Sequence, residues 1–490
     1  MPVDSHLEWS EMRDFSAGLW DVGNQIMPPN AAQQMVDCYP LPGGGMRAWQ
    51  KRQSFTTSGV VDTTHERVRA LHVNEGLTNR SGSGNGNDYW MLTYNTSDTK
   101  CRLYRMDQTA AGPPTTWSLL KTFAAGLDPG NTRFTNYYDV NFNQYVAFSL
   151  GFAGSTDAGV WYVDYSTGTP TKLTGKQGGV FNYQSRLCVN LDSKIWFTDP
   201  GAFTNIDAND APVDINEGNN PAITGAATFS PGDLLVFKAA GPIYLVEGDL
   251  DNYTVRQMNA SKFIGQGGVG AIVKGPNGII FRALNDGIYE TPDGSQLNPL
   301  SSSLLATHFP GSSFYTWSTH FLMDQDSGLV YDYNTKAWFT TTMQGGGVGM
   351  TMARSNTFFI GDNSGATMTL WTLDVNDGST HRAESYTWQS APLRHETGRQ
   401  IEIRSIEVYA RSFNGATSTI SVTVDGDTRT IACDSLGRGG ITFYFLKYKE
   451  ELDVTVTAAS NASGVEAPVI EVIRVGSMGG HFLMQGADAG

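Results

Sequence analysis

The chain has 490 residues, of which 40 % are hydrophobic and 17 % are charged, below the roughly 25 % charged residues usual for soluble domains. Its formal net charge is −15 at pH 7. Proteins that bind nucleic acid tightly usually carry a basic footprint, because much of their affinity comes from neutralising phosphates. The totals therefore argue against tight DNA or RNA binding. The length allows about two to four ordinary domains, or one large repeat architecture with an appendage.

Neither a targeting segment nor a disulfide framework is evident. The chain begins with acidic residues and lacks the apolar segment of a signal peptide, so we expect no leader. No stretch approaches the ~18 apolar residues that span a bilayer, so we expect no membrane span. The cysteines lie far apart and never at C-x-x-C spacing, which favours free, mostly buried thiols. They are Cys38, Cys101, Cys188 and Cys433.

Residues 1–60 are expected to form an N-terminal arm with the first strands. Within it, residues 28–36 (PPNAAQQMV) predict about two turns of helix. Residues 36–55 combine a Pro/Gly turn with a basic cluster around a tryptophan. We interpret this cluster as a docking arm for a carboxylate-rich neighbouring subunit, where complementary charge fixes register. Contact with DNA phosphates is the alternative. The candidate docking residues are Arg47, Trp49, Lys51 and Arg52.

Residues 61–380 contain a weak repeat of an aromatic strand, a turn rich in Asp, Gly or Asn, and a second strand. From the third copy on, the spacing is roughly 40–50 residues, as in four-stranded propeller blades. Each copy would be the outer hairpin of one sheet, and ring closure would leave no exposed end. We predict a β-propeller of six or seven blades; a series of two-sheet sandwiches is the alternative. The copies are 102–107, 160–174, 195–207, 243–255, 288–297, 329–341 and 370–378.

In residues 381–490 the sequence pattern changes after a polar connector at 381–396. Apolar and polar residues alternate strictly in short runs, and residues 424–427 (VDGD) are a strong hairpin signal. About five to eight short strands in ~100 residues are typical of a small β-sandwich. The class predicted for the whole chain is therefore all-β: a propeller followed by a small C-terminal β-sandwich with a loose tail.

Motifs that carry chemistry are missing from the sequence. It has no phosphate-binding loop, nucleophile elbow, H-E-x-x-H or C-x-x-C pair, and the eight histidines never fall at ligand spacing. Residues 324–328 and 374–378 place carboxylates close together, as a calcium loop does, but Asp and Asn also close blade turns. We therefore expect no catalytic residue, no cofactor and no metal site.

A propeller glycosidase is the enzymatic alternative, since two carboxylates at the axis could serve as acid and nucleophile. The chain has 48 Asp and Glu residues, and the sequence does not show which two of them would lie together at the axis. Tryptophans on candidate blade strands could line a sugar platform, although such residues more often pack between sheets. They are Trp161, Trp196, Trp338 and Trp371.

Three consecutive segments with aromatic strands and Gly-rich turns follow one another at 178–207, 223–249 and 263–294. In this order they resemble blades of the tail nozzle and packaged-DNA-stabilisation proteins of short-tailed bacteriophages, a family with related minor tail proteins in long-tailed phages. Residues 28–55 resemble the N-terminal signature of that family, in which a strand ending in Cys-Tyr and a Pro/Gly turn precede an arginine-led segment. The similarity spans roughly residues 20–340 and is interrupted by a Gly/Ser-rich loop at 78–89.

This resemblance implies a non-enzymatic structural protein of the virion tail, made in the host cytoplasm, that forms or surrounds the DNA exit channel. It implies a homo-oligomeric ring, with a hexamer favoured over a trimer, in contact with other tail or connector proteins. Genome DNA would pass without tight binding, and part of the negative charge would face the channel. The alternative is a minor tail protein at the tail tip that contacts the host surface or its glycans.

Overall fold

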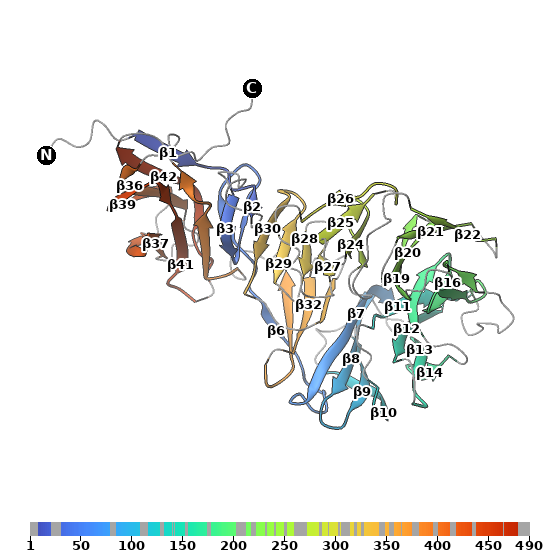
Figure 1. Cartoon of the computed structure of the whole chain (residues 1–490). Helices are drawn as coiled ribbons and strands as arrows, with labels where there is room; N and C mark the ends of the chain where they lie inside the picture. Colours follow the sequence, from blue (N-terminus) through green and yellow to red (C-terminus); the bar gives the residue numbers. More distant parts are fainter. Residues whose placement is uncertain are drawn as a thin grey trace.

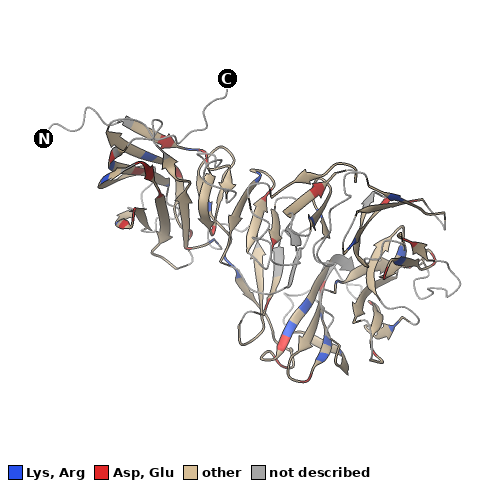
Figure 2. Ribbon diagram, viewed as in Figure 1, with Lys and Arg blue, Asp and Glu red and all other residues tan. Residues whose placement is uncertain are grey.

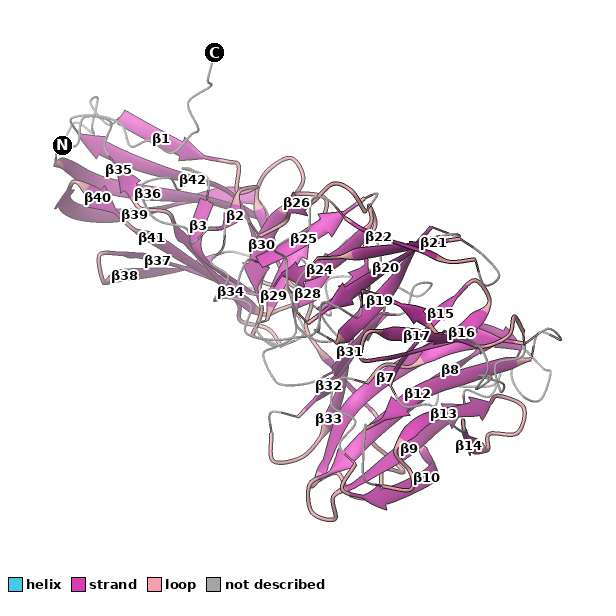
Figure 3. Cartoon of the chain, turned by 45° about the vertical axis from the view of Figure 1, so that its right-hand side comes forward, coloured by secondary structure: helices cyan, strands magenta, loops and turns pink. Residues whose placement is uncertain are grey.

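The computed structural model is built from strands. It describes residues 8–20, 31–78, 85–107, 116–127, 132–139, 141, 143–151, 155–173, 178–201, 212–216, 222–230, 233–239, 242–248, 252–258, 272–283, 287–292, 294–301, 304, 314–317, 321–324, 328–342, 348–351, 357–363, 365–374, 382–394, 400–411, 418–433, 438–463 and 465–478. No helix occurs in these ranges, so none of them holds a helix that could span a membrane. The predicted all-β class is confirmed (Figure 3).

Between residues 53 and 374, the strands form successive four-stranded antiparallel sheets (Figure 1). Up to residue 299 they are β7 (Glu66–Thr78), β8 (Asn85–Asn95), β9 (Lys100–Asp107) and β10 (Ser118–Ala125); β11 (Thr135–Tyr138), β12 (Gln144–Leu150), β13 (Gly159–Asp164) and β14 (Pro170–Lys172); β15 (Gly179–Tyr183), β16 (Arg186–Leu191), β17 (Lys194–Phe197) and β18 (Val213–Asp214); β19 (Ile223–Ser230), β20 (Asp233–Lys238), β21 (Tyr244–Glu247) and β22 (Thr254–Gln257); and β23 (Ile272–Lys274), β24 (Ile279–Ala283), β25 (Gly287–Thr291) and β26 (Asn298–Pro299).

The series continues with two further groups of strands, one of which borrows a strand from the start of the chain. The groups are β27 (Phe314–Trp317), β28 (Phe321–Asp324), β29 (Leu329–Asp332) and β30 (Ala337–Thr340); and β31 (Val348–Thr351), β32 (Thr357–Asp362), β33 (Thr369–Asp374) and β6 (Gln53–Phe55). Each predicted repeat copy supplies the third strand of one of these groups, but four copies do not reach the fourth strand, so the expected outer hairpin is found only in part: those copies are 102–107, 195–207, 288–297 and 370–378. Aspartates close their turns: Asp164 Oδ1 accepts the Ser166 amide at 2.7 Å, and Asp332 Oδ1 accepts the Asn334 amide at 2.8 Å.

These sheets are arranged as a β-propeller. The first strand of each sheet lies innermost and contacts the first strand of the next, in the order β11, β15, β19, β23, β27 and β31, and β31 in turn contacts β7. Apolar clusters fill the space between neighbouring sheets, as a propeller requires. Strand β6 then closes the ring, because it pairs with β33 and so joins an N-terminal segment to the last sheet.

Most of the remaining strands form two sheets that pack face to face, which we call the two-sheet module, and β35 and β40 form a short separate pair. One sheet has the order β39-β36-β42-β5-β4, with β1 paired to β42; the other carries β3, β34, β41, β37 and β38, with β2 beside β3. The strands are β1 (Glu8–Met12), β2 (Gly18–Leu19), β3 (Ala31–Val36), β4 (Cys38–Pro40), β5 (Met46–Ala48), β34 (Ser385–Ser390), β35 (Leu393–Arg394), β36 (Ile401–Arg411), β37 (Ser418–Val424), β38 (Asp427–Cys433), β39 (Arg438–Lys449), β40 (Glu451–Leu452), β41 (Val454–Ser460) and β42 (Val469–Met478).

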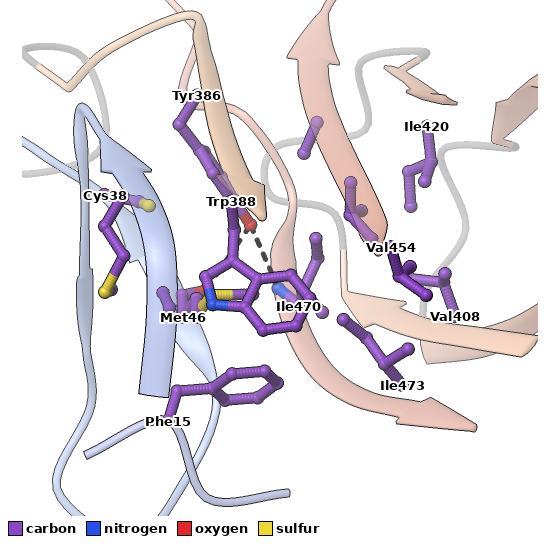
Figure 4. Packing of buried hydrophobic residues seen from close by; sticks show 14 of the residues in the cluster. Phe15, Cys38, Met46, Tyr386, Trp388, Val408, Ile420, Val454, Ile470 and Ile473 are labelled. Carbon is purple, nitrogen blue, oxygen red and sulfur yellow. Dashed lines mark hydrogen bonds between the residues drawn. The ribbon is translucent and has the colours of Figure 1, made fainter. Parts of the chain in front are cut away.

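Strict alternation puts one apolar face of each sheet into the core of the module. Ile473 on β42 and Val408 on β36 face Ile420 on β37 and Val454 on β41, all fully buried (Figure 4). The predicted 424–427 hairpin is present: Val424 pairs with Asp427, and Asp425 and Gly426 have φ of 51° and 77°, as a primed turn demands.

The helix predicted over 28–36 is wrong. In the described part of that segment, residues 31–36 form strand β3, which pairs antiparallel with β34 and parallel with β30. Ala31, Ala32 and Met35 are buried between these partners. Good intrinsic helix formers are overridden here by tertiary pairing with strands that lie more than three hundred residues further along the chain. The strands of the expected N-terminal arm are thus shared between the module and the propeller.

Candidate functional site

Neutral polar side chains join the innermost strands around the propeller axis. His72 Nε2 on β7 lies 2.7 Å from Asn136 Oδ1 on β11, and Asn136 also donates to Asn74 Oδ1. Asn182 Nδ2 on β15 donates to the Asn136 carbonyl at 3.0 Å, and Thr228 Oγ1 on β19 donates to the Asn182 carbonyl at 3.1 Å. Each of these side chains therefore locks one blade to the next at the axis.

Sequence reasoning missed these axial residues, although a signal for them exists. Asn136, Asn182 and Thr228 follow one another at intervals of 46 residues. Asn136 and Asn182 each precede a buried tyrosine, Tyr137 and Tyr183. A polar residue repeated at the blade period in the first strand would have indicated the axis.

One guanidinium reaches across the axis. Arg133, just before β11, donates from Nη1 to the carbonyl of Ile272 on β23 at 2.9 Å. Strands β11 and β23 are separated by β15 and β19 along one side of the ring, and by β27, β31 and β7 along the other. The two strands therefore face each other across the axis, and Arg133 bridges it.

His72 is held neutral by its surroundings. It is partly buried, and desolvation lowers the pKa of His72 below its usual value of 6.5, although its hydrogen bonds to Asn136 and Asn74 oppose the shift. In the unfolded chain the imidazole takes up its proton near pH 6.5. Below that pH the unfolded state binds more protons than the folded state, so folding free energy is lost as pH falls toward the lowered pKa.

We expect His72→Gln to flatten the pH dependence of stability between pH 7.5 and 5.5. Glutamine keeps an amide donor for the two asparagine oxygens and cannot be protonated in this range. Urea unfolding followed by circular dichroism at several pH values measures the slope for both proteins. They should nearly coincide at pH 7.5 and diverge below about pH 6.5. Equal slopes would show that His72 does not contribute.

Each charged residue of the predicted docking cluster contacts its own chain. Arg47 on β5 binds Glu466 with Nε at 2.6 Å and Nη2 at 3.1 Å, and the Glu466 side chain is fully buried. Glu466 raises the pKa of Arg47 through these hydrogen bonds. Arg382 lies on the other side, with its Nε 3.8 Å from Glu466, and donates to the Ala48 carbonyl at 3.0 Å.

The other two cations lie closer to solvent. Lys51 Nζ is 2.6 Å from Glu384 Oε1, and Arg52 Nη1 donates to Asp362 Oδ2 at 3.2 Å. The Arg52 guanidinium also stacks 4.5 Å above the ring of Trp371. Carboxylates expected on a neighbouring subunit are thus found, for all three cations, in the C-terminal third of the same chain. Docking of a second subunit on this cluster stays a prediction.

Trp49 is buried rather than presented to a partner. Its side chain is 1 % exposed and meets Phe321 and Phe339 with ring centroids 4.8 Å away, and Tyr39 at 5.8 Å. Phe321 and Phe339 belong to propeller strands β28 and β30, whereas Trp49 follows β5 of the module. The tryptophan therefore fastens the module to the propeller.

Two of the four tryptophans considered as a sugar platform are core residues, and the other two are partly buried. Trp161 and Trp338 are 5 % and 1 % exposed, and Trp196 and Trp371 pack against buried clusters. The three thiols whose side chains are described are free and buried, as expected: Cys38, Cys101 and Cys188. Residues 325–327 and 375–378 of the two acidic segments lie outside the described residues. No group of three His, Cys, Asp or Glu side chains placed to hold a metal ion occurs among the described residues.

Comparisons with known proteins find distant likenesses only in structure. No protein-family model and no curated protein matches the chain. An exo-β-1,3-galactanase from Phanerochaete chrysosporium has a TM-score of 0.29 and 12 % identity, covering 87 % of this chain and 100 % of that one. The Cps50 (Swd1) β-propeller domain of Myceliophteria thermophila has a TM-score of 0.39 and 10 % identity over 65 % and 99 %. The structure of YCF48 bound to D1 peptide has a TM-score of 0.39 and 9 % identity, covering 67 % of this chain and 96 % of that one.

Proposed function

We propose that this chain is a structural subunit of a bacteriophage tail, of nozzle or hub type, which assembles with identical copies around the DNA exit path. One observation carries the proposal: a single ten-stranded sheet runs from β27 through β30, β3 and β34 to β38. Main-chain hydrogen bonds therefore tie the propeller to the module. A part that guides DNA must keep its shape while the genome passes, and such a sheet resists bending between domains.

The joint between the two units is reinforced at one residue. Asp37, directly after β3, donates its amide to the Thr340 carbonyl at 2.8 Å. Its carboxylate accepts from Thr341 Oγ1 at 2.9 Å and from the amide and hydroxyl of Thr342 at 2.9 and 2.7 Å. These contacts join the end of β3 in the module to the end of β30, the outer edge strand of the β27–β30 group. The resemblance of residues 20–340 to tail nozzle proteins supports the same role.

We further infer that the propeller has seven blades and that the two-sheet module is a β-sandwich. The blade count rests on the strand groups that begin with β7, β11, β15, β19, β23, β27 and β31, the last completed by β6. The sandwich rests on the apolar cluster shared by β36, β39 and β42 on one side and β34, β37 and β41 on the other. In such a subunit, the outer edge strands of the sheets would be the surfaces that contact neighbouring copies.

The DNA path would lie between copies, not through one propeller. Arg133 bridges the propeller axis and the axial asparagines bond one inner strand to the next, so a duplex has no room there. Along the described strands, acidic and basic residues are sparse and interspersed (Figure 2). A lumen formed by several copies can therefore remain weakly interacting toward phosphates.

We expect the purified full-length chain to form closed rings with a central hole in negative-stain images. Mass photometry should give one dominant oligomer, with a hexamer favoured over a trimer. The reason is that a head-to-tail contact between identical copies closes into a ring when its rotation divides a full turn. A monodisperse monomer from nanomolar to tens of micromolar concentration, or an open filament, would overturn the proposal.

A further inference from the structure

The outer face of one module sheet carries exposed aromatic side chains. On β39, Phe443 and Phe445 point into the core, whereas Tyr444, Leu446 and Tyr448 are 74 %, 64 % and 60 % exposed. Surface apolar residues are common singly, but several in one row on a regular strand mark a binding face. We call the outer surface of β1, β42, β36 and β39 the platform face.

Trp9 packs over a glycine on this face. In register, Trp9 on β1 pairs with Gly476 on β42, Gly476 with Ser405 on β36, and Ser405 with Tyr444 on β39. A Cβ at position 476 would lie 3.1 Å from the Trp9 ring and 2.7 Å from Ser405 Oγ. The indole therefore rests on the backbone of β42 and remains 37 % exposed.

A β-bulge shapes the middle of the row. The register of β36 shifts between Ile403 and Ser405 against both β42 and β39, so that Arg404 and Ser405 both leave the core side. Bulges often re-aim side chains at binding sites. Ser405 is 2 % exposed, and its Oγ has no hydrogen-bond partner in the described structure. This buried hydroxyl lies beside the position over which the Trp9 ring packs.

Next to the Trp9 row, a second row of polar side chains crosses β1, β42 and β36, and its members are joined by hydrogen bonds and ion pairs. Arg474 on β42 pairs in register with Glu11 on β1 and Glu407 on β36. Its Nε donates to Glu11 Oε2 at 2.5 Å and its Nη1 to the Tyr409 hydroxyl at 3.2 Å. Tyr409 in turn donates to Glu407 Oε2 at 3.2 Å. All three charged side chains remain about a fifth to a third exposed, at 31 %, 23 % and 21 %.

We propose that the platform face binds a neutral polysaccharide, with Trp9 and Tyr444 as stacking surfaces and the Arg474 row as hydrogen-bonding groups. The apolar C–H faces of a pyranose pack on aromatic rings, and its hydroxyls need donors and acceptors side by side, which Arg474, Glu407 and Glu11 supply. Glu11 also pairs with Arg13, so two carboxylates meet two guanidiniums and their charges balance, which suits an uncharged glycan. This inference goes beyond the structural role and does not depend on it.

The test uses the full-length chain and an array of immobilised neutral polysaccharides, including glucans, mannans, galactans and arabinans. The parent protein should bind at least one of them, and Trp9→Ala and Tyr444→Ala should each weaken that binding at least tenfold. Tyr138→Ala removes a similarly exposed aromatic, 47 % exposed on propeller strand β11, and should bind as the parent does. Circular dichroism checks that every variant is folded.

Three outcomes would overturn the inference. The first is that the parent binds none of the neutral polysaccharides, and the second is that Trp9→Ala and Tyr444→Ala bind as tightly as the parent. The third is that Tyr444→Ala lowers the oligomer mass without changing glycan binding, which would assign the face to a second copy of the chain. Glycan binding is measured whether or not rings form, so its failure and that of the ring proposal are distinguishable.

Discussion

Trp49→Ala is expected to destabilise the protein by about 3–5 kcal/mol, the range for removing a buried tryptophan. The indole is 1 % exposed and lies between Phe321, Phe339 and Tyr39. Its loss leaves a cavity where the module meets the propeller. Urea unfolding followed by far-ultraviolet circular dichroism measures the shift of the first transition. Limited proteolysis should then cut between the two units sooner than in the parent.

The control for this variant is Tyr138→Ala, which removes an aromatic side chain that is 47 % exposed. Exposed substitutions away from special contacts usually change stability by less than about 0.5 kcal/mol. If Trp49→Ala were as mild as this control, Trp49 would not fasten the units.

Glu466→Ala is expected to cost about 3–5 kcal/mol, because it leaves the buried Arg382 and the partly buried Arg47 without their carboxylate. The Glu466 side chain is fully buried and binds Arg47 through two hydrogen bonds, with Arg382 only 7 % exposed on its other side. Removing the anion therefore strands positive charge in a region that water hardly reaches. Urea unfolding at pH 7 measures the loss.

Glu384→Ala is the matched control within the same cluster. Glu384 binds Lys51 at a site where the two side chains are 34 % and 48 % exposed. Exposed ion pairs contribute about 0–1 kcal/mol, so this variant should stay near the parent. Equal losses in Glu466→Ala and Glu384→Ala would mean that burial does not set the strength of the cluster.

The sequence predicts local structure in this chain far better than it predicts partners. The alternating runs and the Asp-Gly turn at 424–427 were sufficient to predict the hairpin there, because hairpin pairing is encoded within a few residues. The helix prediction for 28–36 fails because the strand partners of residues 31–36, β34 and β30, lie hundreds of residues away and leave no local signal.

The basic cluster also shows that the sequence does not reveal which distant residues a segment will contact. Arg47, Lys51 and Arg52 correctly indicated a need for carboxylates. Nothing within the segment revealed that Glu466, Glu384 and Asp362 would supply them from the far end of the chain. Charge type is a local property of the sequence, whereas the identity of a partner depends on topology.

Closure of the propeller by β6 and of the module by β1 has a consequence for biosynthesis. Glu11 on β1 can bind Arg474 on β42 only after 463 further residues have been synthesised. In the same way, Ser54 on β6 can pair with Trp371 only after β33 has been made. During translation these early strands leave the ribosome with unsatisfied edges, and neither unit can be completed until the late strands emerge. Such high contact order slows folding and prolongs exposure to aggregation, so we expect chaperones to hold the nascent chain.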